Sequence, residues 1–196
     1  MTDAQRLVDL LEALQREGTT VVDLARAGQP AEPWRLYPGE EGIVDRHTHD
    51  QVYYHSHDDG RGEAGHFHTV RLFHDRTVHV VGISMAHDGW PRALFTVNAW
   101  VTGDAYESAE QVKAYARRFQ IDEGAGPARL IRFANLVYRA FLPEIERLQD
   151  EKLAALTAHR VRHPTRDPFA DRSLEILSWV DIDLRQCLAG ASLVGR

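Results

Sequence analysis

Apolar residues near the start of the chain recur at spacings of three and four, which is the period of an amphipathic helix. The repeat runs through Leu7, Leu10, Leu11 and Leu14. It predicts a helix over residues 3–17, and a shorter helix is expected over residues 21–27. The same period returns later in the chain and predicts helices over residues 107–121, 128–141 and 144–159. We expect these helices to flank a central section of the chain that forms strands.

That section is rich in β-branched and aromatic residues, which favour strands. It predicts strands over residues 66–74, 77–86 and 92–101, separated by short turns that make them neighbours in a sheet. A last strand is expected over residues 174–184. This order predicts an α+β fold, in which an antiparallel meander of about four strands packs with N-terminal and C-terminal helices. The length predicts a single domain spanning residues 1–196.

The stretch of residues 28–42 contains three prolines, so it is expected to be an irregular or extended connector between helix and sheet. Trp34 and Tyr37 lie within it. They either pin the connector to the core or line the mouth of a pocket.

Histidine changes this picture of an ordinary fold. Nine of the eleven histidines lie between residues 47 and 87, and four of them form the pairs His55/His57 and His66/His68. Side chains alternate along a strand, so both members of a pair project to one side. Residues 58–65 contain three glycines and three carboxylates, a composition that suits a hairpin loop. Such a loop would fold the two pairs together.

Imidazoles that converge from about 2 Å can hold a cation. Glu63 is the loop carboxylate nearest the second pair. The candidate ligands of a divalent metal on this hairpin are therefore His55, His57, Glu63, His66 and His68. Three histidines and one carboxylate would leave a position for water or substrate, and such ligands suit zinc, iron or manganese. The alternative is a solvated sheet face, or a cleft of hydrogen-bonded histidines without metal.

Further polar residues are candidate substrate contacts, namely Tyr53, His79 and Asn98. Unbroken alternation would place His79 on the same side of its strand as Val81 and Ile83. The alternative for His79 is a core histidine whose ring nitrogens are hydrogen-bonded within the protein. The alternative for Asn98 is an asparagine that caps the end of a strand. His47 and His49 lie in a segment that resembles a loop. They are weaker candidates for metal ligands or substrate contacts than the residues above.

Composition narrows the partners. The net charge of −6 argues against nucleic acid, although it permits a small-molecule ligand. Cys187 is the only cysteine, which excludes an intrachain disulfide and cysteine-rich metal sites. The N-terminus lacks the features of a signal peptide and no apolar run is long enough to span a bilayer, so we expect a cytoplasmic protein without membrane contact. The first helix could also serve a homodimer contact.

The order of His55, His57, Glu63 and then His66 or His68 is similar to the cupin metal motif. The glutamate falls six residues after the first pair, and the last histidine follows it within three to five residues. The cupin histidine belongs instead to a distant second motif, and four strands are too few for a jelly roll. The similarity therefore implies common metal chemistry rather than membership.

The chain more closely resembles an uncharacterised family of bacterial proteins, a domain of unknown function. The resemblance rests on YYHxH (Tyr53 to His57), on ExGHFH (Glu63 to His68), and on GISM followed by LFTxNxWVTG (Gly82 to Gly103). It implies no established activity and no catalytic roles. It suggests only that these three stretches belong together.

The leading hypothesis is a metal-dependent enzyme of hydrolase or oxygenase type. The alternative is a non-catalytic small-ligand-binding protein with a histidine-lined cleft, near Tyr53, Trp90 and Trp100. A third interpretation is a structural or subunit protein with its histidines on the surface.

Overall fold

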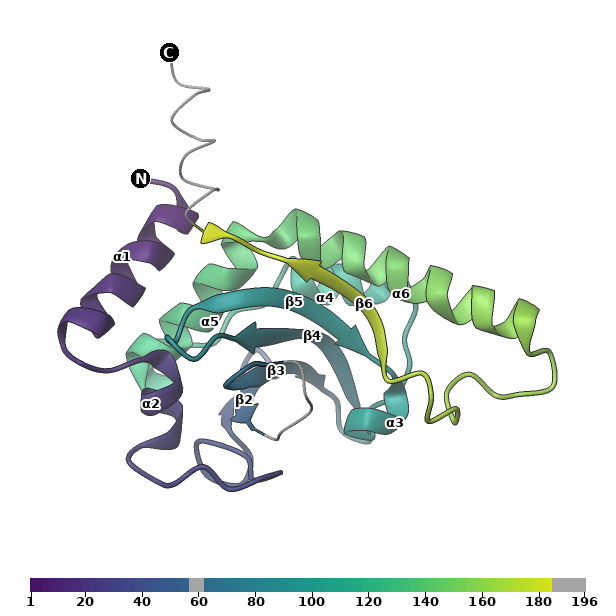
Figure 1. Ribbon diagram of the computed structural model, residues 1–196, viewed down its shortest axis with the longest axis horizontal. Coiled ribbons are helices and arrows are strands. Elements are labelled where there is room, and N and C mark those ends of the chain that lie inside the picture. Colours follow the sequence, from purple (N-terminus) through teal and green to yellow (C-terminus); the bar gives the residue numbers. More distant parts are fainter. Residues whose placement is uncertain (57–61, 185–196) are drawn as a thin grey trace, which may run out of the picture.

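The computed structural model describes residues 1–56 and 62–184, which form a curved antiparallel sheet with helices packed against it (Figure 1). The helices are α1 (Asp3–Arg16), α2 (Val21–Arg26), α3 (Ala99–Thr102), α4 (Ala109–Ala116), α5 (Ala128–Ala140) and α6 (Leu142–Arg162), with a 3-10 turn η1 (Glu123–Ala125) before α5. Helices α1, α2 and α5 begin at the predicted residues and end one residue earlier than predicted. None of the described helices is both long and apolar enough to cross a lipid bilayer.

Within the described residues, the sheet contains six strands in the order in which they occur along the chain. They are β1 (Ile43–Asp45), β2 (Asp50–His55), β3 (Gly65–Leu72), β4 (Thr77–Met85), β5 (Pro91–Val97) and β6 (Ile176–Asp181), and every neighbouring pair is antiparallel. The predicted α+β class is confirmed, whereas the count of about four strands was wrong. β1 has only three residues, which is too short to show a period of two, and the start of β2 was assigned to a loop.

Several predicted ends were also wrong, and two of them by four or five residues. The strand expected over residues 92–101 stops at Val97, because Asn98 caps α3 through a side-chain oxygen that accepts from the Ala99 amide at 2.8 Å. The helix expected over residues 107–121 is limited to α4, which Ser108 caps. The apolar positions beyond α4 pack into the core from an irregular segment.

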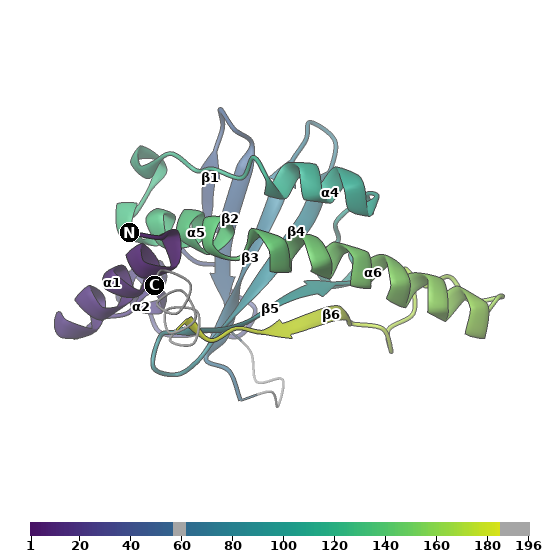
Figure 2. The ribbon, with the colours of Figure 1, turned by 90° about the horizontal axis from the view of Figure 1, so that it is seen from above.

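Helices α4, α5 and α6 lie along one face of the sheet, as the view from above shows (Figure 2). Phe67 on β3 is fully buried against Phe133 on α5, with ring centroids 5.5 Å apart. Thr69, two residues further along β3, shares a 2.6 Å hydrogen bond with the Tyr138 hydroxyl of α5. The odd-numbered side chains at the start of β3 therefore point to the helices, and the even-numbered ones point away from them.

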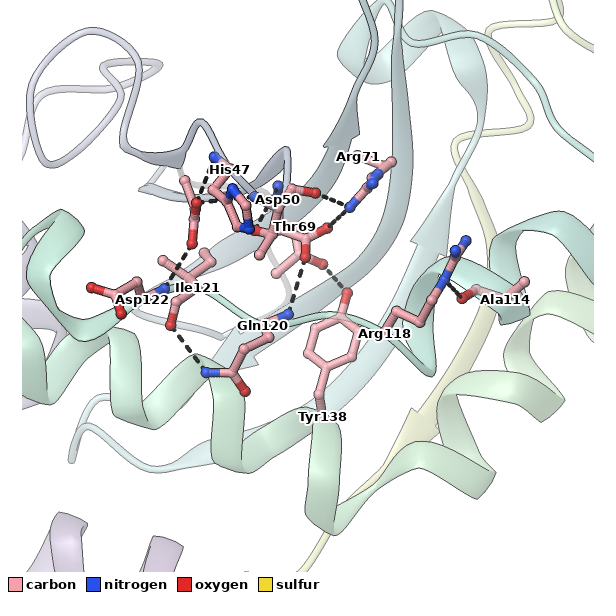
Figure 3. Close-up of polar contacts among 12 residues, drawn as sticks. His47, Asp50, Thr69, Arg71, Ala114, Arg118, Gln120, Ile121, Asp122 and Tyr138 are labelled. Atoms are coloured by element: carbon pink, nitrogen blue, oxygen red, sulfur yellow. Dashed lines mark hydrogen bonds and ion pairs between the residues drawn. The ribbon is translucent and has the colours of Figure 1, made fainter.

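A buried carboxylate joins the sheet to the segment before α5 (Figure 3). Asp50, which is 1% exposed, accepts a hydrogen bond from Arg71 on β3 at 3.0 Å and another from the Gln120 amide at 3.0 Å. Burial raises the pKa of Asp50, while these two donors oppose that rise. The pairing holds the irregular segment against β2.

Replacing Asp50 with alanine is expected to lower the free energy of unfolding by about 2–4 kcal/mol, because the guanidinium and the buried amide lose their acceptor. Urea denaturation followed by circular dichroism measures the change. Asp75→Ala is the matched control, since Asp75 forms an exposed pair with Arg76 and its loss should cost less than about 1 kcal/mol. Equal effects of the two substitutions would contradict the assigned role of Asp50.

Candidate metal centre

The register of β2 against β3 places two histidines side by side. His55 lies directly opposite His66, and Tyr53 lies opposite His68. Directly opposed residues of an antiparallel pair project to the same face. All four side chains therefore stand on the face of the sheet that α5 does not cover.

Three imidazoles form a compact triangle on that face. The ring centroids of His55 and His66 are 4.4 Å apart, those of His66 and His68 4.8 Å, and those of His55 and His68 5.0 Å. One nitrogen from each ring lies within 4.8 Å of the others, which is close enough to hold a metal ion. His66 and His68 are buried, and His55 is half-buried at the end of β2.

Glu63 lies beside this triangle and contacts the outer nitrogen of one ring. Its Oε1 atom accepts a 2.5 Å hydrogen bond from His66 Nδ1, and its Oε2 atom accepts from the Ser84 hydroxyl of β4. The side chain is only 2% exposed. Glu63 thus fixes the orientation of His66 and directs Nε2 toward the other two histidines, as carboxylates do beside metal-bound histidines.

His79 plays the corresponding part for His68, whose Nδ1 atom is 2.9 Å from His79 Nε2. The prediction that His79 shares a side with Val81 and Ile83 was wrong. The register shifts between Thr69 and Val70, because β4 inserts one extra residue there, and the resulting bulge turns His79 to the histidine face. Burial lowers the pKa of His79 well below its usual value, so the ring is neutral near pH 7.

Because these hydrogen bonds engage the Nδ1 atoms of His66 and His68, the Nε2 atoms of the two rings are the ones that face the centre of the histidine triangle. A carboxylate only accepts, so His66 carries its proton on Nδ1 and presents the Nε2 lone pair. His55 Nε2 is 2.5 Å from that atom. A tetrahedral ion bound at 2.0–2.1 Å would set its ligand nitrogens about 3.3 Å apart. Binding would therefore require the two nitrogens to separate by about 0.8 Å.

The triangle forms the floor of a cavity of about 360 Å³. Its remaining described lining is mostly aromatic and aliphatic: Trp34, Leu36, Tyr53, Phe95, Val97, Trp100, Val101, Thr102 and Glu175. These residues come from the connector before β1, from β2 and β5, and from α3 and the approach to β6. Each of the two alternatives for the aromatic residues of the connector applies to one of them. Trp34 lines this cavity, whereas Tyr37 is buried in the core and pairs with Tyr54.

Two glycines allow this packing. Gly82 on β4 faces the ring of Phe95, and a Cβ atom there would lie 2.4 Å from that ring. Its absence lets Phe95 lie against His66 and His68, at centroid distances of 5.3 and 5.9 Å. Gly65 has φ +141° and admits the Tyr54 hydroxyl, which donates to the carbonyl of Ala64 at 2.8 Å. That bond anchors the chain next to Glu63.

Several predicted site residues lie elsewhere. His57 falls outside the described residues. His47 and His49 are exposed in the turn between β1 and β2 and are not part of the triangle. Asn98 is fully buried, and its side-chain amide donates to the carbonyls of Pro168 and Leu174. These hydrogen bonds hold neighbouring parts of the backbone, so the prediction of a substrate contact is not supported by its position. Trp90 also lies outside the cavity.

Ser84 and Phe95 belong to the site and were missed. Their positions follow from register, since Ser84 pairs with His66 and Phe95 pairs with Gly82, which in turn pairs with His68. A glycine inside a strand often marks a close approach of another group. Gly82, which interrupts the β-branched residues of β4, was therefore the sequence signal that an aromatic ring packs closely against this strand.

A larger cavity, of about 590 Å³, lies between α1 and α5 and does not touch the histidines. Two of its arginines are neutralised locally, as Arg129 pairs with Glu17 and Arg132 pairs with Glu123, both at 2.6 Å. Its polar groups are thus engaged with one another. The three histidines line the smaller cavity instead.

The fold and site define an α+β protein whose antiparallel sheet carries a triangle of histidines that could hold a metal. The chain belongs to the family described as a domain of unknown function, DUF6969, whose model matches residues 1–182. This confirms the expected membership of an uncharacterised family. Searches of the curated proteins and of the solved structures found no significant match.

Lys152 of α6 is a buried cation that interacts electrostatically with His79 of β4. Burial lowers its pKa to about 8, and Asp104 opposes the shift. Between about pH 8 and 10.5 the unfolded chain holds this proton while the folded chain does not, so stability rises with pH in that range. Below about pH 8 both states are charged, and the cost of burying the charge is constant.

Lys152→Met is accordingly expected to raise the free energy of unfolding at pH 7 by about 1–3 kcal/mol, because it removes a buried charge. The advantage of the variant over the parent should shrink between pH 8 and 10, as measured by denaturation at a series of pH values. The control is Lys113→Met, since ion pairs with Glu110 and Asp150 raise the pKa of Lys113. An advantage that does not depend on pH would refute the assignment.

Proposed function

We propose that this protein is a metal-dependent enzyme in which His55, His66 and His68 bind a divalent ion at the floor of the cavity. The observation that carries the proposal is the support behind the ligands. Two of the three imidazoles are held at Nδ1 by another buried side chain, Glu63 or His79. Histidines that bind metals are typically oriented in this way.

The ligand set favours zinc over iron. Glu63 was predicted as a ligand, but its two oxygens are engaged by His66 and Ser84. A non-haem iron centre uses two histidines and a carboxylate, whereas three neutral histidines are typical of hydrolytic or hydrating zinc. Three uncharged ligands leave the full charge of the ion to lower the pKa of bound water and to polarise a substrate oxygen.

The protein side chains would divide the remaining work. Glu63 and His79 orient the ligands, and the apolar walls exclude bulk water from the floor. Tyr53 stands beside His55 and His68, at centroid distances of 6.1 and 5.4 Å. Burial raises the pKa of Tyr53, so its hydroxyl keeps its proton and can donate to a bound oxygen.

The metal content of untagged protein tests this proposal. We expect about one zinc per chain by elemental analysis, because three converging imidazoles form a single site. His66→Ala and His68→Ala should each lose the metal, whereas His74→Ala should keep it, since His74 is exposed in the turn after β3. Absence of metal after reconstitution with zinc, iron and manganese would instead favour a metal-free binding cleft. In such a cleft, the 2.5 Å contact between His55 Nε2 and His66 Nε2 would be a hydrogen bond between the two imidazoles.

A second experiment separates an orienting role of Glu63 from a ligand role. Glu63→Ala is expected to weaken zinc binding by about 10–100-fold while one zinc per chain still binds at saturation, because the three imidazoles remain. Glu63→Gln should lose less, since an amide oxygen can still accept from His66. Competition with a chromophoric chelator gives the affinities, and Glu40→Gln is an exposed control. Unchanged affinity in Glu63→Ala would show that the carboxylate does not support the site.

A further inference from the structure

The walls of the cavity indicate which class of molecule the site takes, an inference that rests on the proposed metal centre. We propose that the ligand is a compact molecule with a flat apolar body, such as one aromatic ring, and an oxygen-donor head group that reaches the histidine floor. The cavity volume of about 360 Å³ lies near the lower end of the range of about 300–1,000 Å³ for small-molecule sites.

The contrast between floor and walls sets the orientation of the ligand. The polar nitrogens converge at the floor, where a metal and an oxygen donor would meet. Above them, the wall from β5 is formed by Phe95 and Val97, and the wall from α3 by Trp100 and Val101. An apolar body buried between these walls gains free energy in proportion to its area, whereas a polar body would lose its hydrogen bonds to water.

The aromatic walls are held in place before any ligand arrives. Phe95 stacks on Trp179 of β6, with centroids 5.5 Å apart and planes 21° from parallel. Trp100 donates its indole N–H to the Leu174 carbonyl at 3.1 Å, and the guanidinium of Arg172 lies 4.5 Å from its ring centroid. Fixed aromatic faces favour a flat ligand, because stacking needs no further ordering of side chains.

Trp34 marks the open end of the cavity. It is 70% exposed, yet its ring meets His55 edge to face at 6.2 Å. An exposed indole beside a buried polar floor can close over an apolar ligand and so bury surface that is otherwise in water. Thr102 and Glu175 are the polar residues among the walls, and the other wall residues are mostly aromatic or aliphatic.

Two hydroxamates of different bulk provide the test. Acetohydroxamate and benzohydroxamate share one oxygen-donor head group and differ in a methyl or phenyl body. Calorimetric titration of the zinc-loaded full chain is expected to show benzohydroxamate binding at least about 10-fold more tightly, because only the phenyl ring fills the walls. Trp100→Leu and Trp34→Ala should reduce that ratio and leave acetohydroxamate affinity nearly unchanged. Tyr106→Ala, an exposed aromatic outside the cavity, should preserve the ratio.

The outcomes separate this inference from the metal centre. Equal affinities for the two hydroxamates in zinc-loaded protein would overturn the apolar ligand class and leave the metal site standing. If elemental analysis finds no metal, tryptophan fluorescence titration of the same pair decides. A preference for benzohydroxamate in that form would support the apolar body and overturn the metal-binding head group. No preference in either form would overturn the inference.

Discussion

The register of β2 against β3 is the constraint on which the candidate centre depends. It sets His55 opposite His66 and brings His68 onto the same face. A slip of one residue would turn the histidines toward the helices and Phe67 toward the cavity. Phe67 is fully buried against Phe133 of α5, so the core on one face fixes the position of the polar cluster on the other. Hydrophobic packing and the candidate chemistry are thus opposite sides of one strand.

Crowded imidazoles are costly to bury, and hydrogen bonds from the surroundings of the triangle offset part of that cost. Glu63 and His79 hold two of the rings from outside the triangle. Because His79 is neutral, it adds no positive charge beside a bound cation. The bulge in β4 is therefore more than an irregularity, since without it His79 would face the helices and His68 would lose this partner.

Much of the fold follows from the local pattern of the chain, since the longer helices and the three meander strands each have their own period. The four-residue α3 is the exception, because most of its residues were predicted as the end of a strand. The grouping of His55, His66 and His68 also follows, because alternation and a hairpin loop suffice to bring them together. The roles of Glu63 and His79 depend on more than period. Whether a carboxylate binds a metal or a histidine depends on shifts of a few ångströms in a loop. The face of His79 depends on one inserted residue that no pattern marks.

The aromatic wall has a consequence for the order of folding. Phe95 on β5 stacks on Trp179 of β6, and the two residues pair in the sheet although they lie far apart along the chain. Closing so long a segment costs chain entropy that only later contacts repay, so such pairings form late. The histidine hairpin is local and can form early. During synthesis, the histidine floor of the cavity would therefore exist before its aromatic wall.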